Sequence, residues 1–104
     1  MRGLLSEVSQ TGTAAPVDAF DPGRPWRLHP QVALRDESFG ALVYHFGNRR
    51  LTFLKSRRLV ELVGSLSDYP SAEAAVAALV PPTEHDAYVR ALARLATSEV
   101  IDVA

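Results

Sequence analysis

The sequence of 104 residues contains no cysteine. A disulfide scaffold, a cysteine-ligated zinc site and thiol chemistry are therefore excluded. No apolar run approaches the roughly 20 residues that a membrane-spanning helix needs, and the opening residues MRGLL are too short and too soon polar for a signal peptide. Because a chain without cysteine also fits a reducing compartment, we expect a cytoplasmic protein that has no membrane partner.

An excess of charge of one sign is also missing, since the formal net charge is −1 at pH 7. A strongly basic domain would indicate nucleic acid or an anionic membrane as partner, and neither is favoured here. The total conceals a local basic patch without any acid, which consists of Arg49, Arg50, Lys55, Arg57 and Arg58. Such a charge run is usually a solvated hairpin tip and helix start.

The patterns that mark enzymes are scarce as well. No serine or threonine stands in a nucleophile-elbow context, there is no phosphate-binding loop, and no pair of carboxylates stands out. The three histidines, His29, His45 and His85, share no close spacing that is typical of a metal site. We therefore predict a protein that is not an enzyme and that uses no cofactor or metal.

What is present is one small domain with a strand-rich first half. Residues 1–24 are rich in Ser, Thr, Gly, Ala and Pro and are interpreted as a flexible N-terminal arm, and residues 25–104 as the folded domain. Alternating apolar residues predict strands over 27–35, which Pro30 breaks early, over 39–46 and over 49–54. Between the last two, Gly47-Asn48 predicts a two-residue hairpin turn with a positive φ at the glycine.

After residue 55 the apolar period changes from two to 3.6, which predicts helices. Ser56 is the expected N-cap of the first helix, Ser71 caps a second that Pro81 ends, and Thr83 with Asp86 has the spacing of a capping box for a third. Residues 100–103 add a short strand or a packed tail. Together these elements predict an α+β, winged-helix-like fold, in which a three-stranded antiparallel sheet is followed by three helices.

The third strand and the third helix are the candidate functional elements. A strand at a sheet margin exposes backbone groups that can pair with a peptide. Along the third helix, Ala87 and Ala91 would let a peptide approach closely, and Arg90 and Arg94 can bind carboxylates in bidentate fashion. Trp26 either anchors the arm to the core, which we favour, or forms a hot spot for a partner.

Two segments, WRLHPQVALR and FGALVYHFGNRRLTFLKSRRLVELV, resemble the small chaperones of the mycofactocin system, the MftB family of PqqD-like peptide-recognition modules. The similarity covers roughly residues 20 to 100. It implies a non-catalytic protein that binds the leader of a ribosomally made precursor peptide. It also implies that the protein presents this peptide to a radical SAM maturase.

The resemblance further implies where the leader binds. In related modules the leader adds as a strand to the third strand and lies in the cleft between that strand and the third helix. The corresponding positions here are Arg50, Leu51, Thr52, Phe53, Leu54, Lys55, Ala87, Arg90, Ala91 and Arg94. Leaders of this family tend to be acidic, which suits the cations of this set.

Two alternatives remain open at this point. A winged-helix nucleic-acid-binding protein would use the basic hairpin as its wing. Against this, the third helix opens with Glu84 and Asp86, where a recognition helix would approach DNA, and the domain has no net positive charge. A structural homodimer, formed by edge-to-edge pairing of sheets or by exchange of the N-terminal arm, is the second alternative.

Overall fold

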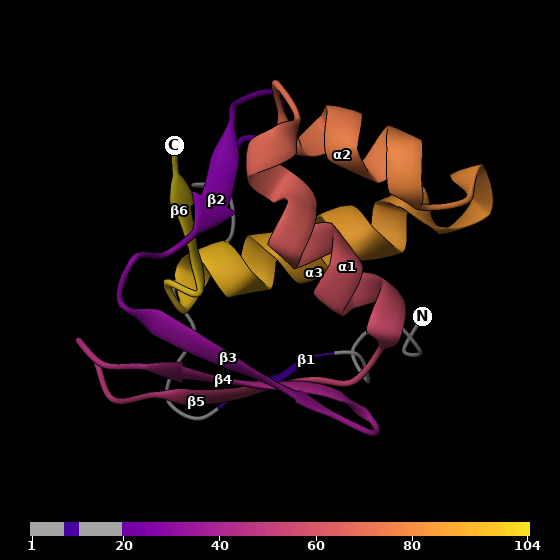
Figure 1. The fold of residues 1–104 in the computed structure, drawn as a ribbon. Coiled ribbons are helices and arrows are strands. Elements are labelled where there is room, and N and C mark those ends of the chain that lie inside the picture. The colour runs from indigo at the N-terminus through magenta and orange to yellow at the C-terminus, as the bar shows by residue number, and fades with distance from the viewer. Residues whose placement is uncertain (1–7, 11–19) are drawn as a thin grey trace.

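The computed structural model describes residues 8–10 and 20–104 (Figure 1). The strands are β1 (Val8–Gln10), β2 (Trp26–Leu28), β3 (Val32–Glu37), β4 (Gly40–His45), β5 (Leu51–Leu54) and β6 (Ile101–Val103). The helices are α1 (Arg57–Ser65), α2 (Ala72–Leu79) and α3 (His85–Thr97), with short 3-10 turns over Leu66–Asp68 and Pro82–Glu84. The predicted α+β class and the three helices are confirmed, and the three predicted strands all contribute to one antiparallel sheet, as β3, β4 and β5.

The main sheet holds one strand more than the sequence predicts. Its order is β1-β5-β4-β3, and all its neighbours are antiparallel. The added strand is β1, which pairs with β5 so that Val8 lies opposite Leu54 and Gln10 opposite Thr52. In the part of the chain that the structure describes, β5 is therefore not the free margin that the sequence suggested. The rest of the predicted arm before Phe20, residues 1–7 and 11–19, lies outside the described residues.

The alternation along β4 and β5 decides which side chains enter the core, as the sequence predicts. The inward-facing, buried residues are Ala41, Val43, His45, Thr52 and Leu54. The rings of Phe39, Phe46 and Phe53 are exposed and lie on the opposite face of the sheet. The rings of Phe39 and Phe53 meet edge to face, with centroids 6.1 Å apart. The sheet therefore has one packed face and one apolar face that is partly exposed.

The turn between β4 and β5 differs from the prediction. It is longer than two residues, and the left-handed conformation belongs to Arg49, whose φ is 64°, rather than to Gly47. The imidazole Nδ1 of His45 accepts the backbone N–H groups of Gly47 and Asn48, at 3.0 and 3.1 Å, which holds the chain in a wider loop. The predicted two-residue hairpin turn is therefore wrong.

The first predicted strand is divided into two strands that belong to different sheets. Pro30, which has no N–H to donate, lies between β2 and β3. β2 leaves the main sheet and pairs antiparallel with β6, so that Trp26 lies opposite Val103 and Leu28 opposite Ile101. The C-terminal residues therefore form a strand, which was one of the two predicted outcomes.

Trp26 anchors the residues before it to the core. Its side chain is 6% exposed, and its ring lies 4.9 Å from that of Phe20. The indole N–H donates a hydrogen bond of 2.9 Å to the carbonyl oxygen of Asp21. The ring and its polar atom are thus both satisfied inside the domain, which supports the anchor interpretation over the hot-spot one.

The first two helices begin where the sequence predicts. The hydroxyl of Ser56 accepts the N–H of Leu59 at 3.1 Å, and that of Ser71 accepts the N–H of Ala74 at 3.0 Å. The capping box of the third helix is wrong, because the 3-10 turn already contains Thr83 and runs directly into α3. An N-cap residue needs extended backbone, which a residue inside a helical turn cannot supply.

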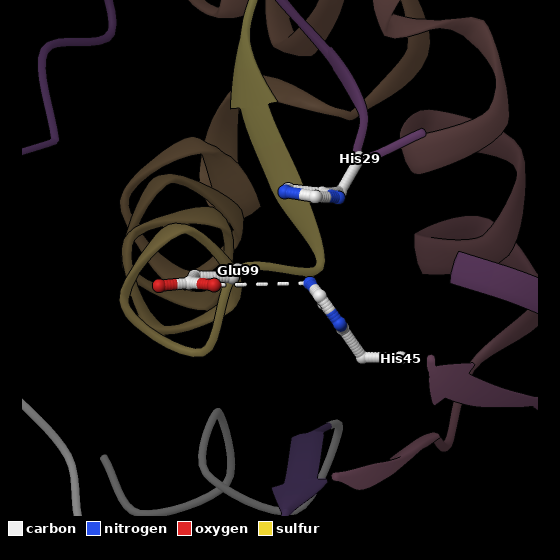
Figure 2. Close-up of side chains that lie close together, drawn as sticks. All are labelled: His29, His45 and Glu99. Atoms are coloured by element: carbon white, nitrogen blue, oxygen red, sulfur yellow. Dashed lines mark ion pairs between the residues drawn. The ribbon is translucent and has the colours of Figure 1, made fainter. Parts of the chain in front are cut away.

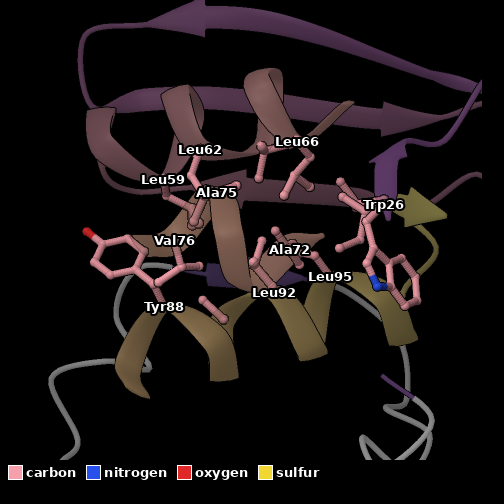
Figure 3. Packing of buried hydrophobic residues seen from close by; sticks show 14 of the residues in the cluster. Trp26, Leu59, Leu62, Leu66, Ala72, Ala75, Val76, Tyr88, Leu92 and Leu95 are labelled. Carbon is pink, nitrogen blue, oxygen red and sulfur yellow. The ribbon is translucent and has the colours of Figure 1, made fainter. Parts of the chain in front are cut away.

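The helices lie on the buried side of the main sheet, and α2 is the helix farthest from it (Figure 1). α1 lies against β4 and β5, while α2 packs on both α1 and α3. Figure 3 shows the resulting core, whose labelled members are Trp26, Leu59, Leu62, Leu66, Ala72, Ala75, Val76, Tyr88, Leu92 and Leu95. Among the described residues, no helix has the length and apolar character needed to cross a membrane.

Candidate functional site at the β5 edge

β5 orders the predicted strand residues in two rows. The side chains of Thr52 and Leu54 are buried, while Phe53 and Lys55 are exposed and Leu51 is half-buried. This arrangement follows from the two-residue period of a strand, since α1 covers only one face. A peptide added beside β5 would therefore contact aromatic and aliphatic surface on the outer face and the helical layer on the inner face.

The backbone of β5 presents its polar groups toward the outer edge at alternate residues. The N–H of His45 donates to the carbonyl oxygen of Arg50 at 3.0 Å across the hairpin. In an antiparallel ladder the bonded pairs alternate, so the N–H and C=O groups of Leu51 and Phe53 are turned away from β4. This is the side on which β1 lies, with Ser9 opposite Phe53. The edge is therefore built to accept an antiparallel strand.

The predicted residues of α3 are not equally accessible. Arg90 is exposed and Ala87 and Arg94 are half-buried, whereas Ala91 is only 2% exposed. α3 contacts β1, and β1 pairs with β5. β1 thus contacts both β5 and α3, the two elements between which the sequence predicts that a peptide lies. With β1 in place, Ala91 does not line an open groove.

The basic patch is divided by the fold. Arg58 forms an ion pair of 3.3 Å with Glu84, and the guanidinium of Arg57 donates to the carbonyl oxygens of Glu37 and Gly40 at 3.3 and 3.2 Å. In the region covered by residues 8–10 and 20–104, the cations whose side chains form no ion pair include Arg49, Arg50, Lys55, Arg90 and Arg94. The four cations of the predicted site, Arg50, Lys55, Arg90 and Arg94, are thus among the described cations that form no ion pair.

Three titratable side chains, which nothing in the sequence connects, lie close together on the packed side of the sheet (Figure 2). His29, His45 and Glu99 come from three separate parts of the chain, and their nitrogen and oxygen atoms lie within 4.8 Å of one another. The two imidazole rings are 4.4 Å apart, and Nε2 of His45 is 3.8 Å from a carboxylate oxygen of Glu99. Because these three residues are far apart in the sequence, no local pattern predicts that they lie together.

The hydrogen bonds of this cluster argue against a metal site. Nδ1 of His45 accepts two backbone N–H groups, and Nδ1 of His29 accepts the N–H of Gln31 at 3.0 Å. A neutral imidazole that accepts at Nδ1 carries its proton on Nε2, which then has no lone pair for a metal. Burial, together with the nearby His29, holds the pKa of His45 below its usual value, while Glu99 acts in the opposite direction.

The sequence profile of the peptide chaperone MftB family matches residues 25–102. The chain belongs to this family. A relative from Mycobacterium ulcerans, named peptide chaperone MftB, is 51% identical over 102 residues, which cover 97% of this chain and 94% of the relative. Relatives of the same name are 52% identical over 104 residues in Mycobacterium tuberculosis, covering 97% and 94%, and 52% identical over 83 residues in Mycolicibacterium smegmatis, covering 79% and 81%.

Membership of the MftB family confirms two predictions, namely a peptide-binding chaperone and a protein that is not a catalyst. A peptide is also the kind of ligand that an exposed sheet edge can bind through its backbone groups. No solved structure matches this chain. The winged-helix likeness of the fold therefore stays a prediction.

Proposed function

We propose that this MftB family protein binds the leader of a mycofactocin precursor peptide in the cytoplasm and presents the peptide to a radical SAM maturase. In this proposal the leader adds as an antiparallel strand to β5. The observation that carries the proposal is that β5 already holds an added strand, β1, on the edge that faces away from β4. An edge that pairs with one segment through its backbone can pair with another, because backbone groups are the same in every peptide.

The side chains around this edge support an ordered, alternating contact with the leader. Successive leader residues would point to opposite faces of the sheet. One set would meet the outer face at Leu51 and Phe53, and the other would face α3 near Ala87 and Arg90. This alternation gives specificity, whereas the backbone pairing supplies affinity that depends little on sequence.

The unpaired cations support an acidic ligand. Arg49, Arg50 and Lys55 flank β5, and Arg90 and Arg94 lie on α3. Because all are at least partly accessible to water, we expect them to raise the association rate and to make binding sensitive to salt. We expect the larger part of the binding free energy to come from the strand pairing and the apolar face instead.

The proposal is tested by fluorescence anisotropy with a labelled synthetic mycofactocin precursor. A scrambled peptide of the same composition and a random-sequence duplex DNA serve as comparisons. We expect saturable binding of the precursor, weaker binding of the scrambled peptide and no tight binding of DNA. Tight DNA binding without precursor binding would replace the proposal by the winged-helix nucleic-acid-binding alternative. Co-elution of a radical SAM maturase with the protein only when precursor is present would test the presentation step.

A further inference from the structure

The proposed leader and β1 require the same backbone groups. β1 lies on the outer edge of β5, with Ser9 opposite Phe53, and it also contacts α3. The outward N–H and C=O groups of Phe53 can pair with only one strand at a time. A leader that adds to this edge and β1 therefore exclude each other.

We infer that Val8–Gln10 is an intramolecular occupant of the peptide-binding edge, which the leader must displace before it binds. This inference rests on the proposed function, since it takes β5 as the docking edge. In the β1-paired state the protein is closed to peptides. The fraction of molecules in which β1 has left the edge then sets the apparent affinity for the leader.

The pairing of β1 is suited to a displaceable occupant. It engages only three residue pairs and leaves Leu51 of β5 without a β1 partner in the described register. Two of its three residues, Ser9 and Gln10, are polar and offer little apolar surface for burial. A longer leader strand can pair along the whole of β5, so it gains contacts that β1 does not make.

The covalent connection compensates for this weak pairing. A segment on the same chain is held near its site at an effective concentration on the order of millimolar. β1 can therefore cover the edge in the absence of precursor even if its pairing is weak. A covered edge also avoids edge-to-edge pairing with a second sheet, which is the usual hazard of an exposed strand.

The first experiment compares the full chain with a truncated chain that begins at Phe20. With the labelled mycofactocin precursor as probe, we expect the truncated chain to bind about tenfold more tightly, because the competent fraction rises. An unlabelled synthetic peptide of residues 1–19 should displace the precursor from the truncated chain. Equal affinities of the two chains, with no displacement by the 1–19 peptide, would overturn the inference.

A second experiment keeps the chain at full length. The variant with Ser9→Cys and Phe53→Cys introduces the only two thiols of the protein, at positions that are direct partners across the ladder. Cross-strand partners in an antiparallel pair have Cα separations that a disulfide can span. We expect the oxidised double variant to lose precursor binding, and the same sample after reduction to bind the precursor as the single variant Phe53→Cys does. If the oxidised and reduced forms bind the precursor equally, β1 does not block the edge.

The two experiments separate this inference from the proposed function. If the full chain binds the precursor but neither truncation nor cross-linking changes the affinity, the proposed function stands and the competition by β1 is wrong. If neither the full chain nor the truncated chain binds the precursor, this result contradicts the proposed function and also the inference that rests on it. Should the truncated chain fail to fold, the reversible cross-link alone decides.

Discussion

Gly40 shows how one residue fixes the position of the β5 edge. Its φ of 149° is open to glycine and disfavoured for other residues, and a Cβ there would overlap the carbonyl oxygen of Leu54. The close approach of these two backbones brings the start of β4 against the end of β5, where Ala41 lies opposite Leu54. The geometry of the proposed docking strand therefore depends on a residue outside the predicted binding set.

Replacing Gly40 with alanine is expected to lower the free energy of unfolding by about 1–3 kcal/mol, the usual range for backbone strain of this kind. The matched control is Gly64→Ala in α1, where nothing lies within 4 Å of the new methyl group. That control should stabilise the protein by roughly 0.5–1 kcal/mol through helix propensity. Urea denaturation followed by circular dichroism measures both, and an equal effect of the two substitutions would contradict this account of Gly40.

The His45 imidazole predicts how stability depends on pH. Its folded-state pKa is lowered, chiefly by burial and then by His29, so the unfolded chain binds the proton more readily than the folded one. Stability should therefore be full above the unfolded pKa near 6.5 and decline as the pH falls through the interval down to the folded pKa. Urea midpoints between pH 7.5 and 5 measure the decline.

Two variants attribute that decline to His45. His45→Asn keeps an acceptor near the position of Nδ1 but cannot titrate, so its urea midpoint should change less between pH 7.5 and 5. Glu99→Gln removes the carboxylate that favours the protonated ring, so the decline should become steeper. A His45→Asn variant with the wild-type pH profile would show that other groups cause the acid sensitivity.

At the scale of single residues, the sequence predicts what depends on near neighbours. The caps at Ser56 and Ser71 and the alternation of buried residues along β4 follow from local spacing, and the structure confirms them. The cluster of His29, His45 and Glu99 could not be predicted from local spacing, because its members are far apart in the sequence. The turn after α3 brings Glu99 back to the sheet. Only the packing of the whole chain creates that neighbourhood.

Among the elements, β5 carries the sharpest test of the proposed site. Phe53→Pro removes an N–H that is turned toward the outer edge and leaves the donors that face β4 in place. We expect precursor affinity to fall by tenfold or more, while Phe53→Ala, which retains the N–H and loses only the ring, should lose less. Anisotropy titrations on variants shown to be folded decide the point. Normal precursor binding by folded Phe53→Pro would exclude β5 as the docking strand.

The charged rim of α3 gives a second prediction at this scale. The double variant Arg90→Glu with Arg94→Glu should weaken precursor binding and reduce its dependence on salt, because two accessible cations become repulsive to an acidic leader. The control, Arg24→Glu with Arg27→Glu, makes the same change of net charge near the β2–β6 ribbon. Titrations at low and high salt measure the difference. Equal losses in the two variants would indicate an effect of net charge rather than contact with α3.

Elements with a clear period were predictable and those without one were not. The strands at β4 and β5 and all three helices follow from apolar periodicity. β1 has only three residues and no alternation to detect, and it becomes a strand because β5 offers unpaired backbone groups beside it. The separation of β2 from β3 likewise depends on β6, which is distant in sequence and becomes its partner.

At the scale of the whole molecule, the β2–β6 ribbon joins residues 26–28 to residues 101–103. Trp26 links this ribbon to the helical core, and its ring is enclosed by residues from both ends of the folded domain. Trp26→Ala should therefore lower the free energy of unfolding by about 3–5 kcal/mol, which is a large part of the stability of a domain of this size. Thermal and urea unfolding measure the loss.

Trp26→Phe separates the structural role of Trp26 from a role in binding. It keeps most of the buried area but loses the hydrogen bond to Asp21, so it should cost roughly 1–2 kcal/mol of stability. In the folded variant, precursor affinity should equal that of the wild type, because Trp26 is buried in the core. A selective loss of affinity without a loss of stability would make Trp26 a contact residue after all.

The same ribbon also brings two distant positions of the chain together. The N–H of Ala104 donates to the carbonyl oxygen of Pro25 at 3.0 Å, at the end of the molecule away from the four-stranded sheet (Figure 1). Two positions that meet in this way can both serve as points of fusion to another protein. A protein fused at residue 104 would therefore leave the β5 edge unobstructed.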